Sequence, residues 1–228
     1  MPITTCIFDA YGTLFDVSSA ARAAAHEPGN DALAECWAEL AVDWRSKQLE
    51  YTWLRAVADA HDDFWNITQD GLDWAMEKHG LTGDNLRNRL MQLYAELSAY
   101  PEVPQMLSSL KNAGYKLAIL SNGEPKMLQS AMTSAGIRDL LDDCLSVENV
   151  GVYKPHARVY DMVGDRFGCS NDEVLFVSSN GWDAGCATGY GFHTAWVNRM
   201  GNPVDRLPWK PHHVLSDLTS IPELVKTL

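Results

Sequence analysis

One carboxylate stands at the end of the first predicted strand. Thr4 to Phe8 is a short apolar run that predicts a buried strand, and Asp9 follows it directly. A carboxylate in this position can attack an electrophilic carbon or phosphorus and form an ester that water later hydrolyses, which divides one difficult displacement into two easier steps. Asp9 is therefore a candidate nucleophile, and a capping carboxylate at a strand-to-turn junction is the alternative interpretation.

The ends of two later predicted strands carry short polar side chains in the same way. These residues are Ser121, Asn122, Ser178, Ser179, Asn180 and Asp183. Each serine or asparagine alone is typical of a helix N-cap or a turn. In an open parallel sheet, however, ligands bind outside the carboxyl ends of the strands, so residues distant in sequence can converge there. Their joint occurrence favours a functional crevice.

The elements that must position these residues alternate along the chain. Apolar runs predict strands at 4–8, 116–120, 174–177 and 194–197. Helices are expected at Pro104–Ala113 and Pro125–Ala135, because Pro stands near each start and Gly just past each end. Alternating strands and helices predict an α/β fold with a parallel sheet covered on both faces, which we interpret as a Rossmann-like core.

The strand pattern disappears between Val17 and about Ser98, where Ala, Leu, Trp, Glu and Arg recur with helical periodicity. We therefore expect a helical cap subdomain at 17–98 inserted into a core formed by 1–16 and 99–228. Pro28-Gly29 should break its first helix. Asp31 is a plausible N-cap for a long helix that runs to about Asp59.

A charge interrupts an apolar row on that expected helix. The row has i+4 spacing and consists of Leu33, Trp37, Ala41, Arg45, Leu49 and Trp53. Such a row drifts by about 40° per step, so only Ala41 and Leu49 share the face of Arg45 firmly. Spacing alone leaves two interpretations of Arg45 open: a cation directed at a ligand, or an arginine that snorkels at the flank of the helix.

Composition excludes several classes of partner. With 18 basic and 30 acidic residues the chain carries a net charge of −12, which argues against binding to nucleic acid or to an anionic membrane and leaves a small anionic substrate possible. The five cysteines form no C-x-x-C pair, and the N-terminal residues indicate neither a signal peptide nor a membrane helix. We expect a soluble, cytoplasmic protein without disulfides, in which the seven histidines bind no metal.

Four ordered motifs and one cap motif resemble those of a known superfamily. The motifs are Phe8–Leu14, Leu120–Gly123, Tyr153–Pro155 and Phe176–Asp183, and the cap carries Trp44–Tyr51, which reads W-R-S-K-Q-L-E-Y. In this order they are similar to the haloacid dehalogenase superfamily, and more narrowly to type II L-2-haloacid dehalogenases. The resemblance covers nearly the whole chain. One motif alone would be weak, since short motifs recur by chance.

The resemblance implies a hydrolase that converts L-2-haloalkanoic acids to D-2-hydroxy acids with inversion at C2. Asp9 would attack C2 and form an ester, while Arg45 and Asn122 receive the halide. Lys154, which Pro155 keeps out of a helix, would hold Asp9 ionised and help neutralise the substrate carboxylate. Asp183 would balance Lys154 and help to activate the hydrolytic water.

Further residues take roles by the same resemblance. Those that would hydrogen-bond the carboxylates, the halide side or the water are Thr13, Ser121, Asn122, Ser178, Asn180 and Tyr160. The apolar wall of the pocket would consist of Tyr11, Leu49, Phe64 and Trp182, although Leu49 and Phe64 could equally be core residues. The cap residue Ser46 stands where the relatives carry a larger Gln; the shorter side chain could widen the pocket, which leaves the preferred substrate size open. A homodimer is expected too.

Tyr11 occupies the position at which phosphatases of this superfamily carry a second acid. That acid protonates an alkoxide leaving group, whereas a halide leaves without a proton and needs a dry pocket and a positive or hydrogen-bonding environment. We therefore expect neither a metal nor an organic cofactor, and 2-halocarboxylate and halide as ligands. Two alternatives stay open: a magnesium-dependent phosphatase, and a catalytically silent protein that binds a small organic acid.

Overall fold

A six-stranded sheet forms the centre of the protein in the computed structural model, which describes all 228 residues. The strands are β1 (Thr5–Phe8), β2 (Lys116–Ser121), β3 (Asp143–Ser146), β4 (Val174–Ser178), β5 (His193–Val197) and β6 (His213–Leu215). They lie in the order β3-β2-β1-β4-β5-β6, and every neighbouring pair is parallel. This is the strand order of a Rossmann-type sheet, so the predicted fold class is confirmed.

Two of these strands have no counterpart in the sequence-based prediction. β3 is half-buried at its start and includes Asp143 and Ser146, and β6 lies at the opposite edge with Val214 exposed. Edge strands bury fewer apolar side chains than central ones, so they lack the continuous apolar run by which the other four strands were predicted.

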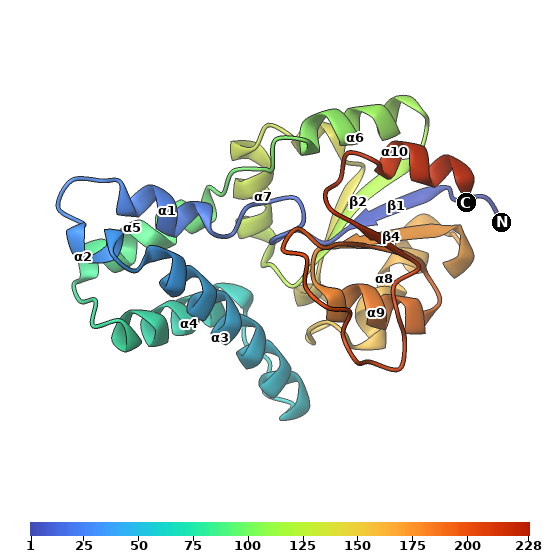
Figure 1. Ribbon diagram of the computed structural model, residues 1–228. Helices are drawn as coiled ribbons and strands as arrows, with labels where there is room; N and C mark the ends of the chain where they lie inside the picture. The colour runs from blue at the N-terminus through green and yellow to red at the C-terminus, as the bar shows by residue number, and fades with distance from the viewer.

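Five helices accompany the sheet: α6 (Val103–Asn112), α7 (Pro125–Ser134), α8 (Ala157–Phe167), α9 (Gly181–Tyr190) and α10 (Ile221–Leu224). Figure 1 shows α6 and α10 over one face and α8 and α9 over the other. The prolines expected at the starts of α6 and α7 occupy their first turns. All five cysteines are free thiols, as predicted. No helix combines the length and the apolar character that crossing a membrane requires.

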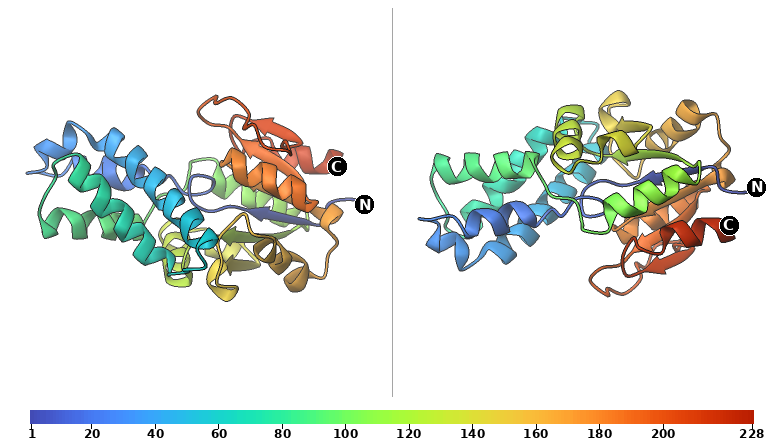
Figure 2. Two further views of the ribbon diagram at one scale, coloured as in Figure 1. Left: turned by 90° about the horizontal axis from the view of Figure 1, so that it is seen from below. Right: turned by 90° about the horizontal axis from the view of Figure 1, so that it is seen from above.

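A helical insert lies to one side of the sheet (Figures 1 and 2). It consists of α1 (Ser19–Ala25), α2 (Asp31–Ala34), α3 (Trp37–Val57), α4 (Phe64–Lys78) and α5 (Asp84–Ala95). The outgoing and returning chains are joined where they leave the core, because Asp16 N donates to Ser98 O at 2.9 Å and Tyr100 N donates to Leu14 O at 3.0 Å. The predicted helical insertion is therefore confirmed.

The prediction of one long helix from Asp31 to Asp59 is wrong. Asn30, not Asp31, is the N-cap residue of α2, and non-helical backbone at Cys36 separates this short helix from α3. The break has a packing reason: α2 packs against α1 and buries Leu33, whereas α3 packs mainly along α4. One straight helix could not face both partners.

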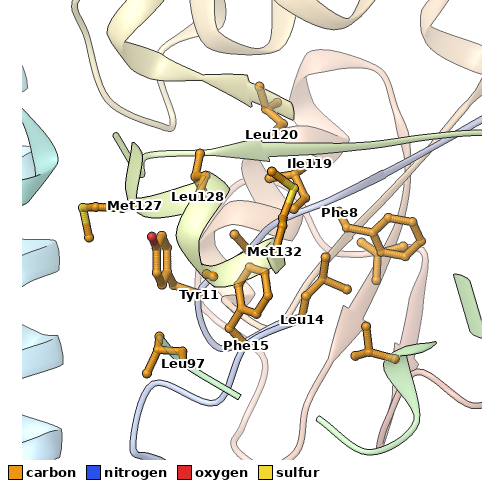
Figure 3. Packing of buried hydrophobic residues seen from close by; sticks show 14 of the residues in the cluster. Phe8, Tyr11, Leu14, Phe15, Leu97, Ile119, Leu120, Met127, Leu128 and Met132 are labelled. Carbon is orange, nitrogen blue, oxygen red and sulfur yellow. The ribbon is translucent and has the colours of Figure 1, made fainter. Parts of the chain in front are cut away.

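The insert and the core meet around Tyr11. This side chain is 2% exposed and belongs to the main hydrophobic cluster. Figure 3 shows its ring near Phe15, Leu97 and Leu128. Gly123 is necessary for this packing, because a Cβ atom there would come within 2.7 Å of the Tyr11 ring. The turn after β2 and the turn after β1 are thus fitted to each other.

Candidate active site

Asp9 lies at the carboxyl edge of the sheet, between the ends of β1 and β4. Its backbone N–H donates to Val177 O at 2.9 Å, and the residue is 6% exposed. Oδ2 accepts hydrogen bonds from Thr13 Oγ1 at 2.8 Å and from Asn180 Nδ2 at 3.0 Å. Oδ1 lies 3.2 Å from Lys154 Nζ. These three donors fix the orientation of the Asp9 carboxylate.

Lys154 lies between two carboxylates. Its Nζ donates to Asp183 Oδ2 at 2.9 Å as well as to Asp9, and the side chain is 1% exposed. Burial lowers the pKa of Lys154, but the charges of Asp183 and Asp9 oppose it, and the net direction is a raised pKa. Lys154 therefore stays protonated and compensates the charges of the two buried carboxylates.

Asp183 is fully buried on the first turn of α9. Tyr160 OH donates to its Oδ1 at 2.8 Å, while its other oxygen accepts from Lys154. Burial raises the pKa of Asp183 above its ordinary value, although Lys154 opposes the shift and Asp9 adds to it. A carboxylate with a raised pKa can accept a proton more readily than an ordinary surface aspartate, which is the property a general base requires.

The turn residues after β2 and β4 position this site through local hydrogen bonds. Ser121 Oγ accepts from Gly123 N at 3.0 Å, and Ser178 Oγ accepts from Asn180 N at 3.1 Å. Asn122 Oδ1 accepts from Lys154 N at 3.0 Å, which leaves its Nδ2 group as a donor. The two serines thus form turns, and Asn122 presents an amide donor beside the pocket.

Arg45 reaches the site from α3 of the insert. Its Nη2 donates to Tyr11 O at 3.1 Å and lies 3.5 Å from Asn180 Oδ1, and its Nη1 donates to Gln48 Oε1 at 2.7 Å. Spacing left open whether Arg45 points to a ligand or snorkels. The geometry favours the first interpretation, because the guanidinium contacts the loop that carries Asp9.

A small pocket lies between the insert and the core, and each of its ten lining residues is one of the predicted site residues. They are Asp9, Tyr11, Arg45, Leu49, Phe64, Ser121, Asn122, Lys154, Asn180 and Trp182. The other predicted residues lie behind this wall: Thr13 and Ser178 at the turns, and Tyr160 and Asp183 beyond Lys154. The structure therefore brings together all fourteen residues that the resemblance assigned to catalysis or substrate binding.

The structure answers the open question of whether Ser46 widens the pocket: the residue has no contact with it. Ser46 is exposed and does not line the pocket. Successive helical residues point about 100° apart, so the residue after Arg45 turns away from the core. The width of the pocket depends instead on Leu49, Phe64 and Tyr11, whose ring also stacks on Tyr94 at a centroid distance of 5.7 Å.

Sequence reasoning missed three residues that support this site. Gln48 is completely buried and accepts the hydrogen bond of Arg45, Tyr94 OH donates to the same oxygen at 3.2 Å, and Thr68 accepts from Gln48 Nε2 at 2.7 Å. A signal for Gln48 was present, since it continues the helical spacing of Ala41 and Trp44 on the buried face of α3.

Comparison with known proteins agrees with this fold and site. A sequence model of the haloacid dehalogenase-like hydrolases matches residues 3–189, and the chain belongs to this family. It is 43% identical over 228 residues to (S)-2-haloacid dehalogenase 1 of Pseudomonas sp. (strain CBS-3), and the match covers 100% of this chain and 98% of that protein. It is also 46% identical over 202 residues to (S)-2-haloacid dehalogenase 4A of Burkholderia cepacia, covering 88% and 85%.

A solved structure is similar over its full length. L-2-haloacid dehalogenase from Xanthobacter autotrophicus, with chloropropionic acid covalently bound, superposes with a TM-score of 0.87 at 35% identity and covers 99% of both chains. Fold and sequence therefore place this chain beside (S)-2-haloacid dehalogenases within the family.

Proposed function

We propose that this protein hydrolyses short L-2-haloalkanoic acids to D-2-hydroxy acids through an ester on Asp9. The observation that carries the proposal is the buried Asp9 carboxylate, held by Thr13, Asn180 and Lys154 in a pocket that Arg45 also lines. The relatives named above support it, since both are (S)-2-haloacid dehalogenases and the match covers 98% and 85% of their lengths.

In the first step, a carboxylate oxygen of Asp9 attacks C2 from the face opposite the halogen. The new C2–O bond forms as the carbon–halogen bond breaks, and the halide leaves with the bonding electron pair. Arg45 and the Nδ2 group of Asn122 would stabilise the departing anion. Lys154 would compensate the carboxylate of the substrate.

In the second step, water adds to the carboxyl carbon of Asp9. The bond between that carbon and the substrate oxygen breaks, the product alcohol takes one proton of the water, and Asp183 accepts the other. Only the first step changes C2, so the configuration inverts. The raised pKa of Asp183, which burial causes, suits it to this role.

The direct test is a halide-release assay with both enantiomers of 2-chloropropionate and no added metal. We expect chloride and D-lactate from the L enantiomer and none from the D enantiomer. Phosphate release from phosphate esters that depends on added magnesium, without chloride release, would instead indicate the phosphatase alternative. Binding of 2-chloropropionate in a thermal-shift assay without any turnover would indicate a silent binding protein.

Two observations disfavour the phosphatase. Tyr11 stands where the leaving-group acid is required, and burial raises the pKa of its phenol well above the ordinary value. The ammonium group of Lys154 lies between Asp9 and Asp183, and no group of three or more His, Cys, Asp or Glu side chains is arranged to hold a metal.

We also propose a cytoplasmic homodimer in which residues 17–98 form the cap. Five free thiols support a reducing compartment. Val42, Leu54 and Val57 of α3 are 66%, 57% and 89% exposed, which supports a second copy of this chain on that helix. We expect Val57→Asp to shift the protein toward monomer in sedimentation velocity, whereas Val57→Ala should leave most of it dimeric. A monomeric wild type would contradict the dimer.

A further inference from the structure

Arg45 is a cation without an anionic partner. Its three polar contacts are the backbone oxygen of Tyr11, the amide oxygen of Asn180 and the amide oxygen of Gln48, all of which are neutral. Most other arginines that contact a neighbouring element pair with a carboxylate, as Arg89 does with Glu27. No carboxylate is therefore paired with the guanidinium in the pocket to neutralise its charge.

The orientation of the Gln48 amide is fixed from both ends. Its Nε2 donates to Thr68 Oγ1 at 2.7 Å, and that hydroxyl in turn donates to Phe64 O at 2.6 Å. Its Oε1 accepts from Arg45 Nη1 at 2.7 Å and from Tyr94 OH at 3.2 Å. The reversed amide would place N–H groups against the donors of Arg45 and Tyr94, so Oε1 must face the guanidinium.

We propose that Gln48 is a positioning residue that aims Arg45 at the leaving halide while leaving its charge unneutralised. This proposal rests on the proposed dehalogenation. A glutamate has the same shape as glutamine and would hold the guanidinium as firmly, but its negative charge would cancel much of the field of Arg45. Neutrality at position 48 is thus a functional requirement, separate from the packing that Gln48 provides.

The nature of the halogen gives this requirement a measurable signature. Chloride is smaller and a poorer leaving group than iodide, so its departure gains more from a nearby cation. A loss of positive charge at Arg45 should slow turnover of chlorinated substrates more than turnover of iodinated ones. A defect of folding alone would slow both equally.

The test compares Gln48→Glu with Gln48→Met, which is of similar size, uncharged and lacks the amide acceptor. For Gln48→Glu we expect kcat with L-2-chloropropionate to fall about 100-fold, of the order seen when one preorganised donor is lost, with a smaller change in KM. The loss should shrink with L-2-iodopropionate. Gln48→Met should lose less with the chlorinated substrate and keep the wild-type ratio of chloride to iodide turnover more closely.

A matched control carries the same chemical change elsewhere. Gln105→Glu adds one negative charge at an exposed position on α6 and should leave kcat unchanged. Circular dichroism gives the folded fraction of each variant, and rates are compared per folded protein. The proposal is overturned if Gln48→Glu retains wild-type kcat, or if both Gln48 variants lose the same activity for every halogen.

Bromide binding separates this proposal from the proposed function. Isothermal titration of sodium bromide should give weaker binding to Gln48→Glu than to the wild type and to Gln48→Met, because bromide would then face a neutralised Arg45. This readout needs no turnover. If the wild type releases no halide from any 2-haloacid, the proposed function fails, and equal bromide affinity in all three proteins would independently refute the role of Gln48.

Discussion

Asp9→Asn should reduce halide release at least about 10⁴-fold, the scale on which enzymes lose activity when a covalent nucleophile is removed. The amide is nearly isosteric with the carboxylate, so it can keep the contacts of Asp9 Oδ2 with Thr13 and Asn180 in altered form. The amide lacks the negatively charged oxygen that attacks C2. Chloride release from L-2-chloropropionate, measured against folded protein, checks this expectation.

A single turnover in ¹⁸O-labelled water tests the same step without a mutation. With enzyme in excess, the heavy oxygen should appear first in the carboxyl group of Asp9, found by mass spectrometry of the peptide that contains it, because water attacks that carbon and not C2. Label in the hydroxy acid after the first turnover would refute the ester.

For the Asp9→Asn variant, the exposed Asp172→Asn serves as a control for the acid-to-amide change and should keep full activity.

Lys154→Met should remove activity and destabilise the protein by about 3 to 5 kcal/mol at pH 7, the usual effect of breaking a buried ion pair. Lys154 is 1% exposed and is the cation shared by Asp9 and Asp183, so its loss leaves two buried carboxylates uncompensated. The free energy of unfolding in urea gives the measurement. An unchanged midpoint would contradict the charge arrangement described above.

The pH dependence of that loss follows from the direction of the pKa shifts. The raised pKa of Lys154 stabilises the wild type at every pH below about 10.4, its ordinary value, and this contribution disappears as pH rises through the folded-state pKa. In Lys154→Met the folded-state pKa of Asp183 should lie above the unfolded value, because burial raises it and the opposing charge of Lys154 is gone. The folded variant then binds more protons, so its stability should rise as pH falls from 7 toward 5, and its deficit against the wild type should shrink.

The sequence predicted those parts of the fold that bury continuous apolar runs. The four central strands, and the helices α6 and α7 with Pro104 and Pro125 in their first turns, follow from periodicity and helix punctuation. β3 and β6 do not, because edge strands share their side chains with solvent. The break at Cys36 also has no local signal, since it arises from the different packing partners of α2 and α3.

For the candidate site, whether a residue could be predicted from the sequence depends on what that residue contacts in the fold. Asp9 and Asp183 could be predicted from their positions after strands, which a parallel sheet brings to one edge. Arg45 could not be assigned from spacing, because its orientation depends on a neighbouring part of the fold. Gln48 was missed for the same reason, since a buried glutamine gains its meaning from Thr68 and Tyr94, which are distant in sequence.

The pocket belongs to neither part of the protein alone, because Arg45, Leu49 and Phe64 come from the insert and Asp9 and Lys154 from the core. A ligand in this pocket contacts both parts, so by thermodynamic linkage its binding and the packing of the insert on the core stabilise each other.

Trp53 of α3 shows what this linkage implies. Its ring meets that of Trp182 on α9 edge to face at a centroid distance of 5.3 Å, yet Trp53 does not line the pocket. Its contact with the core stabilises the packing of the insert against the core, and so it supports ligand binding without lining the pocket. Ligand affinity in this protein therefore depends partly on the contact between the insert and the core.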